Sequence, residues 1–149
     1  MPISECCIRD VICCNAEATL QEAAALMRKH HVGDLIVIDK DPAQRIPLGI
    51  LTDRDIVIET VATGLDVATF TAGDVMSAPV VTVPEDAGFV EALRVMRNRG
   101  VRRLPVTNSE GTLVGLVSAD DILQLLAEEM SMLARTAAQQ RDHEKTARR

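Results

Sequence analysis

Gly-Leu-Val-Ser-Ala-Asp-Asp-Ile at 115–122 is a second copy of Gly-Ile-Leu-Thr-Asp-Arg-Asp-Ile at 49–56. A further pair of similar segments precedes these two, 69 residues apart, and each member joins a helical stretch to an apolar run, at 34–38 and at 103–107. The offset falls from 69 to 66 residues because the turn that follows is three residues shorter in the second copy. Two blocks that recur in the same order predict an internal structural repeat.

Each copy is predicted to run strand, helix, strand, turn, strand, helix. The first strand of the second copy is the β-branched run at 80–83, and 11–14 takes its place in the first copy. One buried face of the next helix is marked by apolar residues at helical spacing, namely Leu20, Ala23, Ala24 and Met27 in the first copy and Phe89, Ala92, Leu93 and Met96 in the second. Neither copy can bury both faces of its own small sheet. We therefore expect an α+β fold of two β-α-β-β-α repeats packed about a pseudo-twofold axis.

The expected organisation is a first repeat at 1–61, a linker at 62–74, a second repeat at 75–128 and a C-terminal helix extension and charged tail at 129–149. The last helix carries one apolar stripe, formed by Ile122, Leu126, Met130, Leu133 and Ala137. An extended core helix and a dimer contact both explain this stripe, and we favour the dimer contact. The charged tail from Gln140 onward is expected to be frayed or disordered.

Composition argues against several classes of function. The 149 residues carry a net charge of −6 and include no Trp, no Tyr and two Phe. Because this charge repels a phosphate backbone and few rings can stack on bases, we expect no nucleic-acid partner. No apolar run approaches the roughly 20 residues that cross a bilayer. The N-terminus also lacks the basic patch of a secretory signal. We expect a cytoplasmic protein with no membrane partner.

The four cysteines form two adjacent pairs, Cys6-Cys7 and Cys13-Cys14. Such pairs make a poor disulfide framework, and a zinc site would need a second cluster, for which His30-His31 is the only local candidate. The two histidines are better explained as a helix end, where His meets the helix dipole favourably. We expect reduced, partly buried thiols and no metal site.

A hydroxyl is followed three residues later by a carboxylate directly after the last strand of each copy, as Thr52 with Asp55 and Ser118 with Asp121. This spacing is typical of a capping box, in which both side chains satisfy free amides of the first helical turn. The same geometry suits a ligand, because a helix start favours an anion and a carboxylate can accept hydrogen bonds from ribose hydroxyls. Both interpretations stay open and can hold together.

These segments resemble the CBS domain, named after cystathionine β-synthase. The resemblance rests on Gly-Val-Arg-Arg-Leu-Pro-Val at 100–106, on the hairpin that follows and on 115–122, and residues 11–60 look like a second CBS domain. Tandem CBS pairs are regulatory modules, usually self-associating, that bind AMP, ADP, ATP, S-adenosylmethionine or related ligands between the two copies. The resemblance therefore implies a stand-alone module that binds an adenosine-containing ligand.

The resemblance also implies two clefts, each taking a hydroxyl and an aspartate from one copy and a strand start from the other. The first cleft would contain Ile50, Thr52, Arg54, Asp55, Val101, Arg102, Arg103 and Pro105. The second cleft would contain Val32, Gly33, Asp34, Leu116, Ser118 and Asp121. In the family, the aspartate holds the ribose, the hydroxyl lies near ribose or phosphate, and apolar strand residues pack on the base.

The two clefts differ in charge. Arg54, Arg102 and Arg103 give the first cleft guanidinium groups that suit phosphate oxygens. The second cleft has Asp120 in place of Arg54 and Asp34 in place of Arg103. We therefore expect a nucleotide in the first cleft, whereas the second is either empty or accepts an uncharged or cationic adenosine derivative.

The expected function is regulatory ligand sensing, in which a conformational shift is passed to an effector protein or across a homodimer. We expect no enzymatic activity, because no Ser-His-Asp order or paired-carboxylate site can be picked out. The alternative is a structural dimerisation module whose Thr-x-x-Asp and Ser-x-x-Asp motifs only cap helices.

Overall fold

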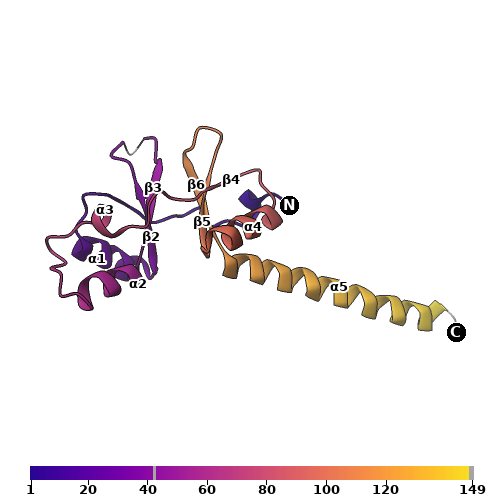
Figure 1. The fold of residues 1–149 in the computed structure, drawn as a ribbon. Helices are drawn as coiled ribbons and strands as arrows, with labels where there is room; N and C mark the ends of the chain where they lie inside the picture. Colours follow the sequence, from indigo (N-terminus) through magenta and orange to yellow (C-terminus); the bar gives the residue numbers. More distant parts are fainter. Residues whose placement is uncertain (42, 148–149) are drawn as a thin grey trace.

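A computed structural model describes residues 1–41 and 43–147 of the chain. The first repeat contains β1 (Cys13–Asn15), α1 (Leu20–His30), β2 (Asp34–Ile38), β3 (Pro47–Thr52), α2 (Asp53–Ile56) and the π-helix η2 (Val57–Val61). The second repeat contains β4 (Val83–Pro84), α4 (Phe89–Arg99), β5 (Arg103–Thr107), β6 (Leu113–Ser118) and α5 (Ala119–Ala147). Two short helices, η1 (Ile3–Glu5) and α3 (Ala72–Val75), precede the repeats. The repeats lie side by side, and α5 projects away from both (Figure 1).

Each repeat forms a three-stranded sheet with the same topology. β1 is parallel to β2 and β2 is antiparallel to β3, and β4, β5 and β6 repeat this arrangement. The registers are equivalent, with Ile36 opposite Ile50 in one sheet and Pro105 opposite Leu116 in the other. The predicted α+β fold of two β-α-β-β-α repeats is confirmed.

Helix α1 shows how each repeat builds its own core. Leu20, Ala23 and Met27 are buried against the sheet. Ala24, which the sequence pattern assigned to the same face, is exposed, so this part of the prediction is wrong. The buried face of α1 is narrower than the full set of apolar positions, and Ala24 lies outside it.

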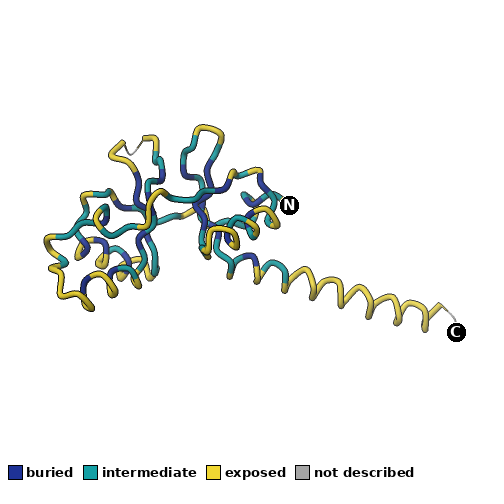
Figure 2. The backbone as a smooth tube through the Cα atoms, viewed as in Figure 1, coloured by how far each residue is buried: buried dark blue, intermediate teal, exposed yellow. Residues whose placement is uncertain are grey.

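A third apolar cluster joins the two sheets. Ile36 and Ile38 of β2 are buried together with Leu113 of β6, and Ile50 and Leu116 pack against them. Each sheet therefore covers apolar surface that the other sheet leaves open. The buried residues at the centre of the molecule reflect this packing (Figure 2).

The segment that precedes each repeat packs on the other repeat. Ile3 is fully buried in the core of the second repeat, and its N–H donates to the carbonyl of Ala87 at 2.7 Å. Its counterpart Ala72 is fully buried in the core of the first repeat, and its N–H donates to the carbonyl of Ala18 at 2.7 Å. Each packing unit therefore combines its own strands with a segment that lies outside the repeat in sequence.

Helices α1 and α4 end at equivalent residues in the left-handed region. His31 follows α1 with a φ of 54°, and Gly100 follows α4 with a φ of 66°. The N–H of each donates to a carbonyl of the last helical turn. The interpretation of His30-His31 as a helix end is confirmed.

Helix α5 continues to Ala147, so the expectation of a frayed or disordered tail is wrong for the described residues, and 148–149 lie outside them. Every residue from Ala127 to Ala147 is exposed (Figure 2). The segment lacks large apolar residues toward its end, but it is rich in Ala, Gln, Arg and Glu, which favour a helix without tertiary packing. Within residues 1–41 and 43–147, no helix combines the length and the apolar character needed to span a membrane.

Candidate ligand-binding clefts

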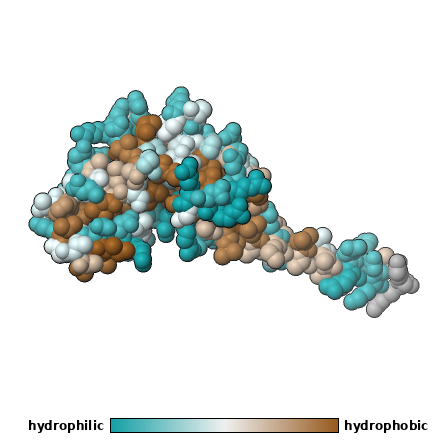
Figure 3. All heavy atoms as spheres, viewed as in Figure 1, coloured by the Kyte–Doolittle hydropathy of each residue, from teal (hydrophilic) through white to brown (hydrophobic). Residues whose placement is uncertain are grey.

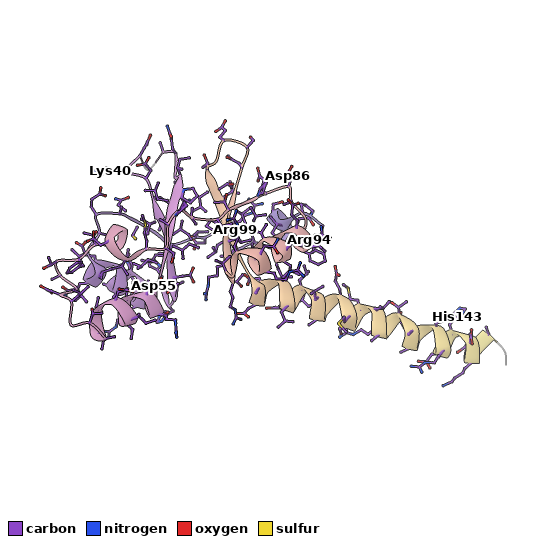
Figure 4. The ribbon with its side chains drawn as sticks, viewed as in Figure 1. Lys40, Asp55, Asp86, Arg94, Arg99 and His143 are labelled. Carbon is purple, nitrogen blue, oxygen red and sulfur yellow. The ribbon has the colours of Figure 1, made fainter. Side chains whose placement is uncertain are left out.

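One pocket, about 210 Å³ in volume, lies between the two repeats. Its walls come from β3, from the start of α2, from the segment before β4 and from the start of β5. The lining residues are Ile50, Thr52, Asp55, Ser77, Pro79, Val80, Val81, Val101, Arg102 and Arg103. Asp55 lies on the side of the first repeat that faces the second (Figure 4).

Six of the eight residues predicted for the first cleft line this pocket: Ile50, Thr52, Asp55, Val101, Arg102 and Arg103. Arg54 and Pro105 are not among the lining residues. Arg54 is exposed on α2, one residue before Asp55 and therefore on a different side of the helix. Pro105 is fully buried in β5, opposite Leu116 of β6. A role in ligand binding stays a prediction for the six residues that the pocket brings together.

Sequence reasoning missed the segment before β4. The pattern predicted a strand at 80–83, whereas β4 comprises Val83–Pro84 and the preceding residues form one wall of the pocket. Ser77 lies along β3, and its N–H donates to the carbonyl of Ile50 at 2.9 Å. The wall could have been predicted by assuming that the first strand of the second repeat pairs in parallel with β5, as β4 does. Parallel strands begin at the same edge of a sheet. Val80 and Val81 must then lie beside the residues that precede β5.

The carboxylate of Asp55 closes a capping box at the start of α2. Its Oδ2 accepts a hydrogen bond from the N–H of Thr52 at 2.9 Å, and Thr52 Oγ1 accepts one from the N–H of Asp55 at 3.1 Å. The predicted cap is confirmed. Among the hydrogen bonds of the described residues, Oδ2 is the atom of Asp55 that the cap uses, so Oδ1 remains a potential acceptor for a ligand in the pocket.

Both arginines of the pocket are paired with carboxylates. Arg102 Nη2 lies 2.9 Å from Asp120 Oδ1 in an exposed pair. Arg103 Nε lies 3.1 Å from Asp34 Oδ1, and the side chains in this second pair are 41% and 13% exposed. The pair between Arg103 and Asp34 is the stronger restraint, because exposed ion pairs contribute little.

Asp34 links the pocket to the second predicted cleft. Burial raises the pKa of Asp34 above its ordinary value, Arg103 opposes this, and the negative charges of Asp53 and Asp121 raise it further. The charges of Asp53 and Asp121 therefore act on Asp34 at this site, and Arg103 is the cation that balances Asp34. The arrangement favours a cation and disfavours a phosphate group.

The residues predicted for the second cleft repeat the cap of the first. Ser118 donates to Asp121 Oδ2 through its N–H at 2.8 Å and through its Oγ at 2.6 Å, and the N–H of Asp121 donates back to Ser118 Oγ. Ile8 takes the position of Ser77, because its N–H donates to the carbonyl of Leu116 at 2.8 Å. Val32 and Gly33 lead into β2 beside Asp34. The backbone frame is the same as in the first cleft, and the charge is opposite.

The four cysteines are free thiols. Burial raises the pKa of Cys14 to about 11, and burial likewise raises the pKa of Cys6 and of Cys7. The thiols of Cys6, Cys7 and Cys14 are therefore neutral near pH 7. In residues 1–41 and 43–147, no three side chains of His, Cys, Asp or Glu are placed to hold a metal ion.

Two strand-helix repeats that face one another across a shared pocket define a tandem repeat module. A family model described as "CBS domain" matches residues 3–61 and 72–128. The chain belongs to the CBS-domain family, and the resemblance inferred from the sequence is confirmed.

Proteins of the same family show how far the similarity extends. The chain is 39% identical over 123 residues to an uncharacterized protein of Methanopyrus kandleri, and the match covers 83% of this chain and 61% of that protein. It is 42% identical over 118 residues to hypoxic response protein 1 of Mycobacterium tuberculosis, and this match covers 79% of this chain and 80% of that protein. The chain thus spans less than two thirds of the first relative and most of the second.

Solved structures share the fold. A CBS domain protein from Pyrobaculum aerophilum complexed with AMP superposes with a TM-score of 0.74 at 28% identity, covering 86% of this chain and 99% of that one. Hypoxic response protein I with two coordinated zinc ions superposes with a TM-score of 0.72 at 38% identity, covering 83% and 98%. The AMP and the zinc ions are properties of those proteins.

Proposed function

We propose that this chain is a regulatory module that binds an adenosine-containing nucleotide of the AMP class in the pocket at Asp55. The observation that carries the proposal is the pocket itself, which joins the carboxylate of Asp55 in one repeat to Arg102 and Arg103 in the other. The AMP complex of the Pyrobaculum aerophilum relative supports an adenosine ligand. The proposal includes no catalytic step.

The chemistry of the lining matches the three parts of a nucleotide. Asp55 Oδ1 can accept hydrogen bonds from ribose hydroxyls while Oδ2 stays in the cap. Ile50, Val80 and Val101 supply an apolar wall for the base. Arg102 and Arg103 can present guanidinium groups to phosphate oxygens.

The size of the pocket supports an orientation in which the base and ribose are enclosed and the phosphate lies at the open edge. Its volume of about 210 Å³ is below the roughly 300–1,000 Å³ of a typical small-molecule site. The base and ribose would fill the enclosed part, which leaves the phosphate at the open edge. Arg102 lies at that edge, since its side chain is largely exposed.

A nucleotide in this pocket would act on the relative position of the repeats. Arg103 of the second repeat pairs with Asp34 of the first repeat. A phosphate would compete for Arg103, so the ligand favours an arrangement in which this link between the repeats is weakened. Differential affinity for two arrangements is what lets a ligand shift their populations. The output would pass to an effector protein or across a homodimer.

A structural dimerisation module is the second candidate, and the completed capping boxes favour it. Val57 and Leu123 are exposed apolar residues at equivalent positions of the two repeats, and Val61 lies one turn beyond Val57. We propose that this face, formed by α2, η2 and the start of α5, contacts a second copy of the chain. In the second candidate the clefts only cap helices.

A thermal-shift screen with AMP, ADP, ATP, S-adenosylmethionine and NAD separates the two candidates. A ligand that binds only the folded state raises its stability, by about 2.7 kcal/mol at one hundred times the dissociation constant. The ligand-sensing proposal expects a rise in melting temperature with AMP. No shift with any of the five compounds at millimolar concentration would favour the structural candidate.

A further inference from the structure

Beyond Leu126, the apolar residues of α5 are not covered by any other part of the described chain. Residues 127–147 are all exposed, and the side chains of Met130 and Leu133 are 71% and 72% exposed. Apolar surface continues along the first half of the projecting helix before polar residues take over toward its end (Figure 3). An isolated helix gains little from such a surface unless a second element buries it.

The seam has the spacing of a two-helix coiled coil. Leu126, Met130, Leu133 and Ala137 are separated by four, three and four residues. This alternation keeps one narrow apolar edge facing a partner helix. Leu126 is half-buried against the core of the second repeat, and the other three are exposed. Ala127 and Ala134 border the seam on one side, while Glu129 and Thr136 border it on the other. Small residues beside a seam allow two helices to approach closely.

The charges of α5 are distributed unevenly along the helix, and this distribution favours a partner helix that runs in the reverse direction. Residues 119–134 contain four carboxylates, Asp120, Asp121, Glu128 and Glu129, and no Lys or Arg. Residues 135–147 contain three cations, Arg135, Arg141 and Lys145, and two carboxylates, Asp142 and Glu144. A second α5 running in the reverse direction matches this pattern, whereas a parallel copy would place the acidic halves side by side.

We propose that α5 pairs antiparallel with α5 of a second copy of this chain. Met130 packs opposite the partner's Leu133, and Leu126 packs opposite the partner's Ala137, so a large side chain meets a small one in the outer layers. This pairing extends the homodimer of the proposed function to a second surface, and it needs no ligand.

Sedimentation analysis of the full chain and of two single variants tests the surface. Leu133→Glu places a charge in the seam, and we expect the dimer dissociation constant to rise by about tenfold or more. Met132→Glu is the matched control, because Met132 is also exposed, at 60%, but lies outside the seam. It is expected to change the constant by less than about twofold. A monomeric wild-type chain, or equal association of wild type and Leu133→Glu, would overturn the proposal.

Val61→Glu distinguishes failure of this inference from failure of the proposed dimer face on the repeats. If Val61→Glu dissociates the dimer and Leu133→Glu does not, the pairing of α5 is wrong and the face on the repeats stands. If Leu133→Glu weakens association more than Met132→Glu does, α5 is an interface whatever Val61→Glu does.

Two substitutions at one position test the direction of pairing. In an antiparallel pair, Thr136 lies beside the partner's Glu129, so Thr136→Lys should tighten the dimer and Thr136→Glu should weaken it. In a parallel pair, Thr136 would lie beside the partner's Arg141, and the two effects would exchange sign. Both variants lose the same hydrogen bond, from Thr136 Oγ1 to the carbonyl of Met132. The reversed order would overturn the antiparallel arrangement.

Discussion

The pocket at Asp55 and the predicted second cleft at Asp121 share a backbone frame and differ in charge. Asp55 and Asp121 close the same capping box at equivalent helix starts. Arg103 and Asp34 begin equivalent strands, 69 residues apart, and pair with each other between the two repeats. The duplicated fold therefore supplies two similar frames, and single side chains at the strand starts give these frames different charges.

The largest expected effect is the loss of AMP binding when the carboxylate of the first cleft is removed. Asp55→Ala should weaken AMP binding by about a hundredfold, because it removes charge-assisted hydrogen bonds to the ribose. Asp121→Ala is the matched control: it removes the equivalent cap, with the same expected stability cost of about 1 kcal/mol, and should leave AMP affinity within about twofold. Calorimetric titration measures both, and equal losses would remove the distinction between the clefts.

A methyl group at equivalent glycines should also affect the clefts differently. A Cβ on Gly49 would lie 2.9 Å from the carbonyl oxygen of Ser77, in the wall of the pocket, and close to the movable side chain of Met76. A Cβ on Gly115 would lie 3.1 Å from the carbonyl oxygen of Ile8 and close to the movable side chain of Cys7. Gly49→Ala should therefore destabilise the fold by about 1–3 kcal/mol and weaken AMP binding.

Gly115→Ala should cost less stability and leave AMP affinity unchanged, because the backbone contact is looser and lies outside the pocket. Chemical denaturation and calorimetry of the two variants test this contrast. A larger loss of AMP affinity in Gly115→Ala than in Gly49→Ala would mean that the second cleft holds the nucleotide.

The frame of the site was predictable because it depends on short-range patterns. Thr52 and Asp55 are three residues apart, and the repeat offset places a second such pair at Ser118 and Asp121. Caps and strand starts follow from local spacing. The charge difference between the clefts was visible for the same reason, since residues at equivalent positions can be compared directly in the sequence.

Pairing across the repeats was not predictable in the same way. The link between Arg103 and Asp34 depends on how the two sheets face one another, which neither local pattern contains. The packing of Ile3 on the second repeat and of Ala72 on the first also crosses the expected boundaries. The helical tail was missed because an exposed helix has no buried stripe to reveal it, so intrinsic propensity was the remaining signal.

Removing one of the two cations of the first cleft should separate phosphate binding from base and ribose binding. Arg103→Gln should weaken AMP binding by about tenfold and leave adenosine binding within about twofold, because adenosine lacks the phosphate. Arg99→Gln removes the same charge from the exposed end of α4 and serves as the control (Figure 4). Equal losses for AMP and adenosine would show that Arg103 supports the pocket without contacting phosphate.

The smallest effect is expected at the carboxylate that pairs with Arg103. Asp34→Asn should tighten AMP binding by about threefold, because a neutral side chain competes less well for the guanidinium. Asp120→Asn releases Arg102 from an exposed pair and should change AMP affinity less. Weaker AMP binding in Asp34→Asn would mean that the pair positions Arg103 for the ligand.

The difference in stability between the Asp34→Asn variant and the wild type should also depend on pH in a defined direction. Burial raises the pKa of Asp34, so the folded chain binds this proton more tightly than the unfolded chain does. The ionisation of Asp34 therefore lowers stability as the pH rises from the ordinary aspartate value toward the raised one. Thermal melts should show that Asp34→Asn gains stability relative to wild type across this window. A gain that is greatest at the acidic end would contradict the assignment.

The number of AMP molecules bound by the wild-type chain tests the central claim most directly. Calorimetric titration of the full chain with AMP should give one site per chain, because the cleft at Asp55 carries the cations and the cleft at Asp121 carries the carboxylates. Two equivalent sites per chain, or no heat of binding at millimolar AMP, would contradict the account.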